Sequence, residues 1–216
     1  MAANSCPTLN STADMQAPTI EQERLVVALG KLDRPRPIPN SYWATGYLLA
    51  CEYPWHPLDS SCTKLEALLR AGTRTFVDLT EDGELSPYEA YLLVLARQLR
   101  IDDTELEYHR FPIRDRSLPE SVEHMHSVMA VLRDNMDRGR ITAVHCRGGI
   151  GRTGMVIGCL LVERFNLTGE EALQIIAREW QGVAKRITYP HSPETPAQFA
   201  FVREFQPEKV CQQLVF

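Results

Sequence analysis

A glycine-rich segment between two apolar runs, at residues 144–154, constrains the fold of this chain more than any other stretch. The run before it, residues 141–144, is typical of a short buried strand. The run after it, residues 155–162, is apolar and long enough for a buried helix. Cys146 and Arg152 lie in the turn between the two runs, with three glycines between them. A strand, a tight turn and a buried helix in this order predict a fold of alternating strands and helices.

The chemistry of this turn favours binding of a phosphate group. Glycine adopts positive φ without a Cβ clash, so the loop can turn several backbone N–H groups toward one centre. The following helix adds its N-terminal N–H groups and partial positive charge, and the guanidinium of Arg152 can hold two phosphate oxygens. Because the same field favours the thiolate of a cysteine at the floor of the loop, Cys146 is predicted to be a nucleophile aimed at phosphorus.

A dinucleotide-binding loop is the main competing interpretation. The pattern G-x-G-x-x-G is matched by Gly149, Gly151 and Gly154. Arg152 would then place a bulky cation where the helix must approach the pyrophosphate, and the pattern gives Cys146 no role. The acids about 20 residues further on, Glu170 and Glu171, fall in a predicted helix instead of at a strand end. A Walker loop is excluded because no G-K-[S/T] follows the glycines.

The segment from His145 to Gly154 resembles the H-C-x5-R-[S/T] signature of the cysteine-dependent protein phosphatases, tyrosine-specific and dual-specificity. The resemblance implies that Cys146 is the nucleophile and that the ring of His145 fixes the backbone of the loop. It also implies that the Thr153 hydroxyl donates to the cysteine sulfur, although a helix N-cap is the other interpretation of Thr153. The loop residues that would bind the phosphate are Arg147, Gly148, Gly149, Ile150, Gly151 and Arg152.

Cleavage of a phosphate ester also needs a general acid, because the leaving oxygen must be protonated. The best candidate is Asp115, in a loop between a predicted strand end and a helix start. The spacing P-x-x-D-x-x-x-P in this loop, together with residues 80–85, is similar to that of the cyclin-dependent kinase-associated phosphatase and related dual-specificity enzymes. Such loops carry the acid in that superfamily. The alternative is that Asp115 pairs with Arg114 or Arg116 in an ordinary surface loop.

Two further positions have roles that the sequence leaves open. Residues 194–199 resemble the glutamine-bearing loop of tyrosine phosphatases, which places the hydrolytic water. Gln198 matches one of its glutamines and Glu194 stands where the other would be; the alternative for Gln198 is a surface glutamine at a helix start. Arg147, directly after the cysteine, either adds positive potential at the rim or pairs with an acid such as Glu81.

The whole chain is predicted to hold one α/β domain, with a central mostly parallel sheet flanked by helices as in the protein tyrosine phosphatases. Residues 1–18 are predicted to be a disordered tail, residues 19–40 an N-terminal helix and a proline-rich strap, and residues 41–216 the phosphatase domain. The helix predicted over residues 119–136 has Val122, Met125, Met129 and Leu132 on its inner side. The predicted strands lie within residues 42–50, 75–79, 107–111 and 141–144, and the other predicted helices within 21–32, 61–71, 87–99, 155–162, 168–180 and 195–206.

The composition limits which binding partners and which cellular compartment are expected for this chain. The formal net charge of −5 argues against nucleic acid, and no apolar stretch is long enough to cross a membrane. No C-x-x-C motif is formed by the six cysteines, at positions 6, 51, 62, 146, 159 and 211. The N-terminal residues do not resemble a signal peptide. A cytoplasmic protein is therefore expected, with the nucleus left open. No metal is expected, since His124 and His126 are two residues apart on a helix and face different ways.

These observations lead to one expected function and two alternatives. We expect a monomeric phosphatase that removes phosphate from phosphotyrosine, phosphoserine or phosphothreonine in a protein through a cysteinyl-phosphate, without a cofactor. Phosphatases of inositides often carry lysine within the loop where this chain has Ile150, which favours a phosphoprotein. The alternatives are a phosphatase of a non-protein substrate, such as an inositol phosphate or an RNA 5′ end, and a phosphate-binding docking module with little turnover.

Overall fold

The computed structural model describes residues 34–58, 61 and 63–208. The tail predicted over residues 1–18 and the helix predicted within residues 21–32 lie outside the described residues. The elements, in chain order, are β1 (Ser41–Thr45), β2 (Leu48–Cys51), α2 (Thr63–Arg70), β3 (Thr73–Asp78), α3 (Glu89–Gln98), the 3₁₀ turn η1 (Asp103–Glu105), β4 (Glu107–Arg110), α4 (Val122–Asp137), β5 (Ile141–His145), α5 (Gly151–Phe165), α6 (Gly169–Trp180), the 3₁₀ turn η2 (Ala184–Ile187) and α7 (Pro196–Glu204).

Five strands form one sheet in the order β1-β2-β5-β3-β4. The hairpin of β1 and β2 is antiparallel, while β5 runs parallel to both β2 and β3, and β4 runs parallel to β3. The predicted α/β fold with a mostly parallel sheet is therefore confirmed. Because β5 is the middle strand, the loop that follows it leaves the centre of the sheet at the carboxyl ends of the strands, where ligand sites of such sheets lie.

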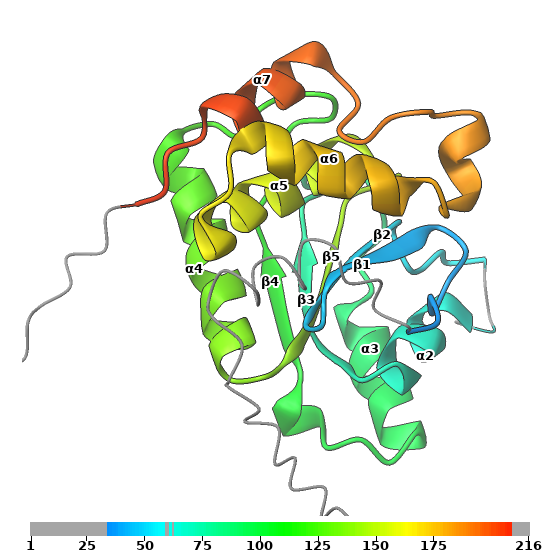
Figure 1. Cartoon of the computed structure of the whole chain (residues 1–216). Coiled ribbons are helices and arrows are strands. Elements are labelled where there is room, and N and C mark those ends of the chain that lie inside the picture. Colours follow the sequence, from blue (N-terminus) through cyan, green and yellow to red (C-terminus); the bar gives the residue numbers. More distant parts are fainter. Residues whose placement is uncertain (1–33, 59–60, 62, 209–216) are drawn as a thin grey trace, which may run out of the picture. The chain divides into compact units, whose positions relative to one another are not determined.

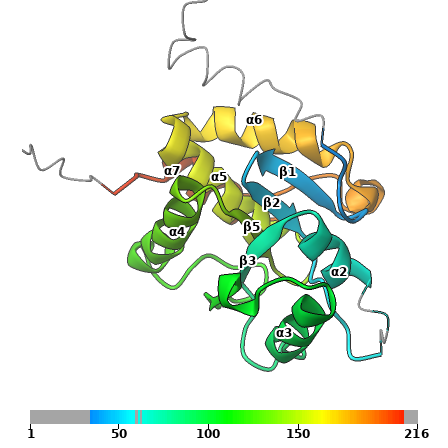
Figure 2. The same ribbon diagram turned by 90° about the horizontal axis from the view of Figure 1, so that it is seen from below.

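Helices cover both faces of the sheet (Figures 1 and 2). α4, α5 and α6 lie on one face, and α2 and α3 lie on the other. Burial explains this arrangement: the leucines of α2 at positions 65, 68 and 69 are almost completely buried against Phe76 of β3 and Ala143 of β5. α5 is buried along most of its length, as the apolar run in the sequence predicts.

Close packing of α7 on α5 depends on a glycine in the buried helix. A Cβ atom on Gly158 would lie 2.7 Å from Cγ1 and 2.9 Å from Cγ2 of Val202 in α7. These distances are shorter than van der Waals contact, and Val202 is completely buried, so its side chain has no space into which it can move. The two helices can approach this closely only because position 158 has no side chain.

Replacing Gly158 with alanine is therefore expected to destabilise the fold, although alanine is the better helix former. Overpacking of this kind costs about 1–3 kcal/mol, which would lower the thermal unfolding midpoint measured by circular dichroism. Gly46 in the β1–β2 turn is the matched control, because a Cβ there meets nothing within 4 Å. A Gly158→Ala variant as stable as Gly46→Ala would contradict this account of the α5–α7 contact.

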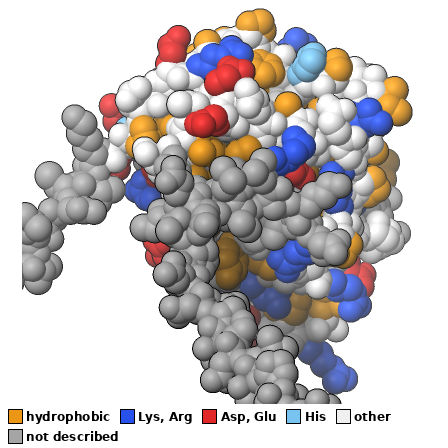
Figure 3. Space-filling model, in the orientation of Figure 1, with side chains coloured by type: hydrophobic (Ala, Val, Ile, Leu, Met, Phe, Trp, Pro, Cys, Tyr) orange, Lys and Arg blue, Asp and Glu red, His pale blue; other side chains and the backbone are white. Residues whose placement is uncertain are grey.

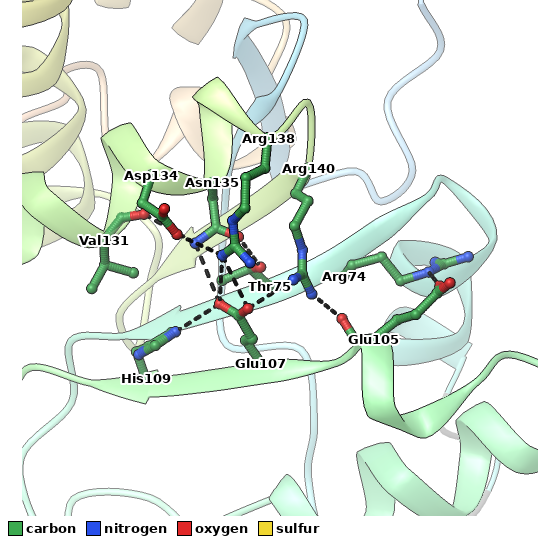
Figure 4. A network of polar contacts seen from close by, with 10 residues as sticks. All are labelled: Arg74, Thr75, Glu105, Glu107, His109, Val131, Asp134, Asn135, Arg138 and Arg140. Atoms are coloured by element: carbon green, nitrogen blue, oxygen red, sulfur yellow. Dashed lines mark hydrogen bonds and ion pairs between the residues drawn. The ribbon is translucent and has the colours of Figure 1, made fainter.

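The edge strand β4 is tied to its neighbours by one carboxylate (Figure 4). Glu107 Oε1 accepts hydrogen bonds from Arg138 at 3.0 Å and from Arg140 at 2.7 Å, and Oε2 accepts from Asn135 at 3.4 Å. Partial burial opposes ionisation of Glu107, yet the bonds from His109 and Arg138 outweigh it and lower the pKa of the carboxyl. This cluster joins β4 to the end of α4 and to the turn before β5, and so supports the end of the sheet away from the loop after β5.

Residues 34–39, the described part of the proline-rich strap, run along the domain. The guanidinium of Arg34 lies 4.2 Å from the ring centroid of Trp43 and donates to the carbonyls of Gly46 and Ala71. Arg36 donates to the carbonyl of Glu179 at the end of α6. Main-chain carbonyls at the ends of three elements are thus held by two arginines.

The surface carries both signs of charge. On the face drawn in Figure 3, basic and acidic side chains lie among one another, without a large area of one sign. Among the helices of the described residues, none combines the length and the apolar character needed to cross a membrane.

Candidate active site

A pocket of about 340 Å³ is lined by the loop that leads from β5 into α5. β5 and α5, which this loop joins, are labelled in Figure 1. Cys146 lies at this loop and is 3% exposed. The pocket brings together residues from four separate stretches of the chain. Its lining residues are Asp115, Arg116, Cys146, Arg147, Gly148, Ile150, Gly151, Arg152, Lys185, Tyr189 and Glu194.

The loop itself depends on Gly149. This glycine has φ of 71°, and a Cβ atom on it would lie 2.4 Å from the carbonyl oxygen of Cys51 in β2. Only glycine combines that backbone conformation with so close an approach of another main chain. The carbonyl of Arg147 accepts a hydrogen bond from the N–H of Tyr53 at 3.2 Å, so the loop is also held from the β2 side.

Arg152 is fixed by a carboxylate that the sequence did not single out. Its side chain is fully buried, and its two terminal nitrogens donate to the two oxygens of Glu84 at 2.7 and 2.8 Å. A third bond joins Nη1 to the carbonyl of Ile113 at 3.0 Å. Burial opposes ionisation of Glu84, but the bonds from Arg152 outweigh it and lower the pKa of that carboxyl. Such a fork–fork pair fixes the plane of the guanidinium.

Removing the charge of Glu84 is therefore expected to impair catalysis without unfolding the protein. In Glu84→Gln the guanidinium loses its planar support, and a shift of about 1 Å at a reacting centre can cost on the order of 100-fold in rate. Steady-state kcat/KM on a phosphopeptide measures the loss, and the unfolding midpoint checks the fold. Glu89→Gln, on the exposed face of α3, is the control with the same chemical change. Equal activity of the two variants would contradict the positioning role of Glu84.

Asp115 lies beside the same arginine. Its Oδ1 accepts from Arg152 Nη2 at 2.7 Å, and its side chain is 52% exposed. The alternative in which Asp115 pairs with Arg114 or Arg116 is wrong within the described residues, since its ionic partner is Arg152. Its backbone N–H donates to Glu81 Oε2 at 3.2 Å. Glu81 thus holds the loop of Asp115 and makes no ion pair with Arg147 in the described part of the chain.

Thr153 and His145 are both completely buried next to the loop. The N-cap of α5 is Ile150, so the interpretation of Thr153 as the helix cap is wrong. Thr153 Oγ1 has no hydrogen-bond partner within the described residues. The ring of His145 bonds through Nε2 to the hydroxyl of Tyr88 at 2.6 Å. Burial lowers the pKa of His145 to about 4, so the imidazole is neutral at pH 7.

Gln198 and Glu194 occupy different places. Gln198 is completely buried, accepts from the N–H groups of Glu194 and Thr195, and donates to the carbonyl of Ser117 at 3.1 Å. It is not a surface glutamine; it caps α7 and links that helix to the loop of Asp115. Glu194 lines the pocket and lies 3.5 Å from Arg116.

Lys185 and Tyr189 line the pocket but were missed in the sequence. Both belong to the segment around η2, between α6 and α7, where no periodic pattern or motif marks them. Lys185 Nζ lies 2.6 Å from Glu52 Oε2 and donates to the carbonyl of Gly148 at 3.2 Å. No group of three or more His, Cys, Asp or Glu side chains that could hold a metal ion occurs among the residues with described positions.

Comparisons with known proteins agree with this geometry. The sequence model of the family described as "Polymorphic toxin system, DSP-PTPase phosphatase" matches residues 56–166. Protein tyrosine phosphatase domain-containing protein 1 of Danio rerio is 28% identical over 183 residues, which are 82% of this chain and 24% of that protein. The chain thus spans about a quarter of the length of the first curated relatives that it matches.

Two solved structures share the fold. The active form of Tk-PTP superposes with a TM-score of 0.60 at 23% identity, over 77% of this chain and 95% of that one. A kinase associated phosphatase with its catalytic cysteine replaced by serine gives a TM-score of 0.56 at 24% identity, over 73% and 84% of the two chains.

Proposed function

This chain belongs to the family described as polymorphic toxin system DSP-PTPase phosphatase, and on that premise we propose that it removes phosphate from phosphotyrosine, phosphoserine or phosphothreonine in proteins through a cysteinyl-phosphate. One observation carries the proposal: Arg152 donates a hydrogen bond to Asp115, and both residues line a pocket that Cys146 also lines. The side chains that we propose as nucleophile, phosphate-binding cation and proton donor thus border the same small space. A docking module would need the cation but neither of the other two groups.

In the first half of the reaction, the thiolate of Cys146 attacks phosphorus, and an S–P bond forms while the P–O ester bond breaks. Asp115 gives its proton to the leaving oxygen, which departs as an alcohol or phenol. The loop N–H groups and the guanidinium of Arg152 carry the charge on the phosphoryl oxygens in the transition state. The fork from Glu84 keeps the guanidinium in one plane throughout this step.

In the second half, the carboxylate of Asp115 takes a proton from water, and the water oxygen attacks phosphorus. The S–P bond breaks, inorganic phosphate leaves, and the thiolate is restored. The hydroxyl of Thr153 is buried without another acceptor in the described residues, which supports a role in donating to the departing sulfur. Glu194 lines the pocket and can position the water, whereas Gln198 acts through its bond to Ser117.

The proposal extends to the chain as a whole. Residues 41–216 are proposed to form one monomeric phosphatase domain that works without a cofactor or metal, in the cytoplasm, on a phosphorylated protein. It is tested by phosphate release from matched phosphotyrosine, phosphoserine and phosphothreonine peptides, an inositol polyphosphate and a 5′-triphosphate RNA. Turnover of a phosphopeptide in chelator-containing buffer supports it. Phosphopeptide binding without release, or turnover of the inositol phosphate or the RNA alone, would overturn it.

A further inference from the structure

Two cations that line the pocket, Arg147 and Lys185, lack a carboxylate of their own within the described part of the chain. Arg147 lines the pocket and is exposed, and its side chain has no hydrogen bond or ion pair with any residue of described position. Arg147 directly follows Cys146, and its charge is one of the weaker causes that lower the pKa of the Glu84 carboxyl. All of its N–H donors are available to a second acceptor.

Lys185 is the second cation without a carboxylate of its own. This lysine shares the carboxylate of Glu52 with Lys64, at 2.6 and 2.7 Å, so two ammonium groups are balanced by one carboxylate. Burial opposes ionisation of Glu52, yet the two lysines outweigh it and lower the pKa of the carboxyl, so Glu52 is ionised at neutral pH. Glu52 and the carbonyl of Gly148 take two of the three N–H donors of Lys185, and its side chain lines the pocket.

The other two cations of the pocket each face at least one carboxylate. Arg116 lies 3.5 Å from Glu194, and Arg152 is held by Glu84 and Asp115. Arg147 and Lys185 are therefore the pocket cations with less than one carboxylate each among the described residues. Because the formal net charge of the chain is −5, the protein as a whole does not attract anions. An anionic ligand is attracted only locally, by cations such as these two.

The surroundings of the pocket fit a polypeptide better than a small polyanion. Ile187, two residues after Lys185, is 86% exposed, and Tyr189, which lines the pocket, is 43% exposed. On the opposite segment, next to Asp115 and Arg116, Leu118 is 38% exposed. Exposed apolar side chains close in sequence to lining residues from two stretches of the chain offer contacts to the residues flanking a phosphorylated side chain, whereas an inositol phosphate has no apolar groups for them.

We propose that Arg147 and Lys185 form a second anion-binding subsite, which selects phosphopeptides that carry acidic side chains next to the phosphorylated residue. The inference rests on the proposed function, because it names the substrates of the same pocket. Carboxylates of the peptide pair with the two cations while the phosphate occupies the loop. Exposed ion pairs of this kind are weak because water and salt screen them, so an acidic flank is expected to raise kcat/KM about five- to tenfold.

The test uses peptide pairs that differ only in whether the residues flanking the phosphorylated residue are Asp or Asn, made with phosphotyrosine and with phosphothreonine. The quantity measured is the ratio of kcat/KM for the Asp peptide to that for the Asn peptide. Wild type is expected to give a ratio of about five to ten at low salt, which falls toward one near 1 M salt, where the Debye length is only about 3 Å.

The double variant Arg147→Gln/Lys185→Gln shows whether the two cations recognise the flanking residues or only support the loop. If the two cations recognise the acidic flanking residues, the kcat/KM ratio falls to between one and two. If they only support the loop, both peptides lose activity equally and the ratio keeps its wild-type value. Arg186→Gln is the matched control, because Arg186 is an exposed cation on the same turn that does not line the pocket, and it is expected to keep the wild-type ratio.

Failure of the inference and failure of the proposed function give different results. A wild-type ratio near one, with both peptides hydrolysed, overturns the subsite and leaves the phosphoprotein phosphatase standing. A ratio that survives in the double variant overturns it as well. Hydrolysis of p-nitrophenyl phosphate or an inositol polyphosphate without hydrolysis of any phosphopeptide overturns both.

Discussion

Replacing Cys146 with serine is expected to abolish phosphate release, with a loss of about 10⁴-fold or more in kcat. The change keeps the shape of the side chain and exchanges sulfur for oxygen. A serine hydroxyl has a far higher pKa than a thiol, so no anion attacks phosphorus, even with Arg152 and the loop in place. The measurement is phosphate release from p-nitrophenyl phosphate and from a phosphotyrosine peptide. Binding of the peptide, followed by calorimetry, should persist, since the loop and Arg152 are unchanged.

Cys159 provides the matched control for this substitution. It lies on α5, fully buried, and burial raises the pKa of its thiol well above the ordinary value, so it stays protonated. Cys159→Ser makes the same chemical change within α5, at a residue that does not line the pocket, and is expected to keep kcat, even where it lowers the unfolding midpoint. Full activity of Cys146→Ser, or loss of activity in both variants with the fold intact, would refute the assignment of the nucleophile.

The fold was predictable because its strongest signals are local. The apolar run of α5 and the strands before it have lengths and patterns that few other folds accommodate, and Glu170 and Glu171 lie in the first turn of α6, as predicted, not at a strand end. The first residue of α4 was harder to predict. The helix begins at Val122 after the cap Ser121, and Val122 is 47% exposed, so its predicted inward position is wrong. At the first turn of a helix, periodicity alone cannot tell a buried residue from one at a rim.

The site was predictable only as far as its residues fall within a motif. Glu84 and Arg152 are 68 residues apart and meet because β3 and β5 are neighbours in the sheet, a pairing that no local pattern encodes. In the sequence, Glu84 is one of three acids within four residues, and nothing distinguishes it from Glu81. Lys185 is still harder to find, since it contacts the carbonyl of Gly148 and the carboxylate of Glu52, which both lie on segments distant in the sequence.

Replacing Asp115 with asparagine is expected to lower kcat by about 100- to 1,000-fold on a phosphotyrosine peptide, within the range typical of a lost general acid. Asparagine keeps the size of the side chain and its ability to accept a bond from Arg152, but it cannot give a proton to the leaving oxygen. The loss should therefore depend on the leaving group. It should be smaller with p-nitrophenyl phosphate, whose phenoxide leaves well without protonation, and larger with phosphothreonine, whose alkoxide leaves poorly.

This dependence on the leaving group separates proton donation from a merely structural role for Asp115. Its carboxylate also bonds to Arg152 at 2.7 Å, so a loss of activity alone could come from a displaced guanidinium. Displacement would weaken phosphate binding and slow all substrates by a similar factor, as Glu84→Gln is expected to do. Absence of the proton donor leaves KM nearly unchanged, and the loss of kcat then differs between substrates according to the pKa of their leaving groups. An equal loss on p-nitrophenyl phosphate and phosphothreonine would thus reject Asp115 as the acid and leave it as a second support of Arg152.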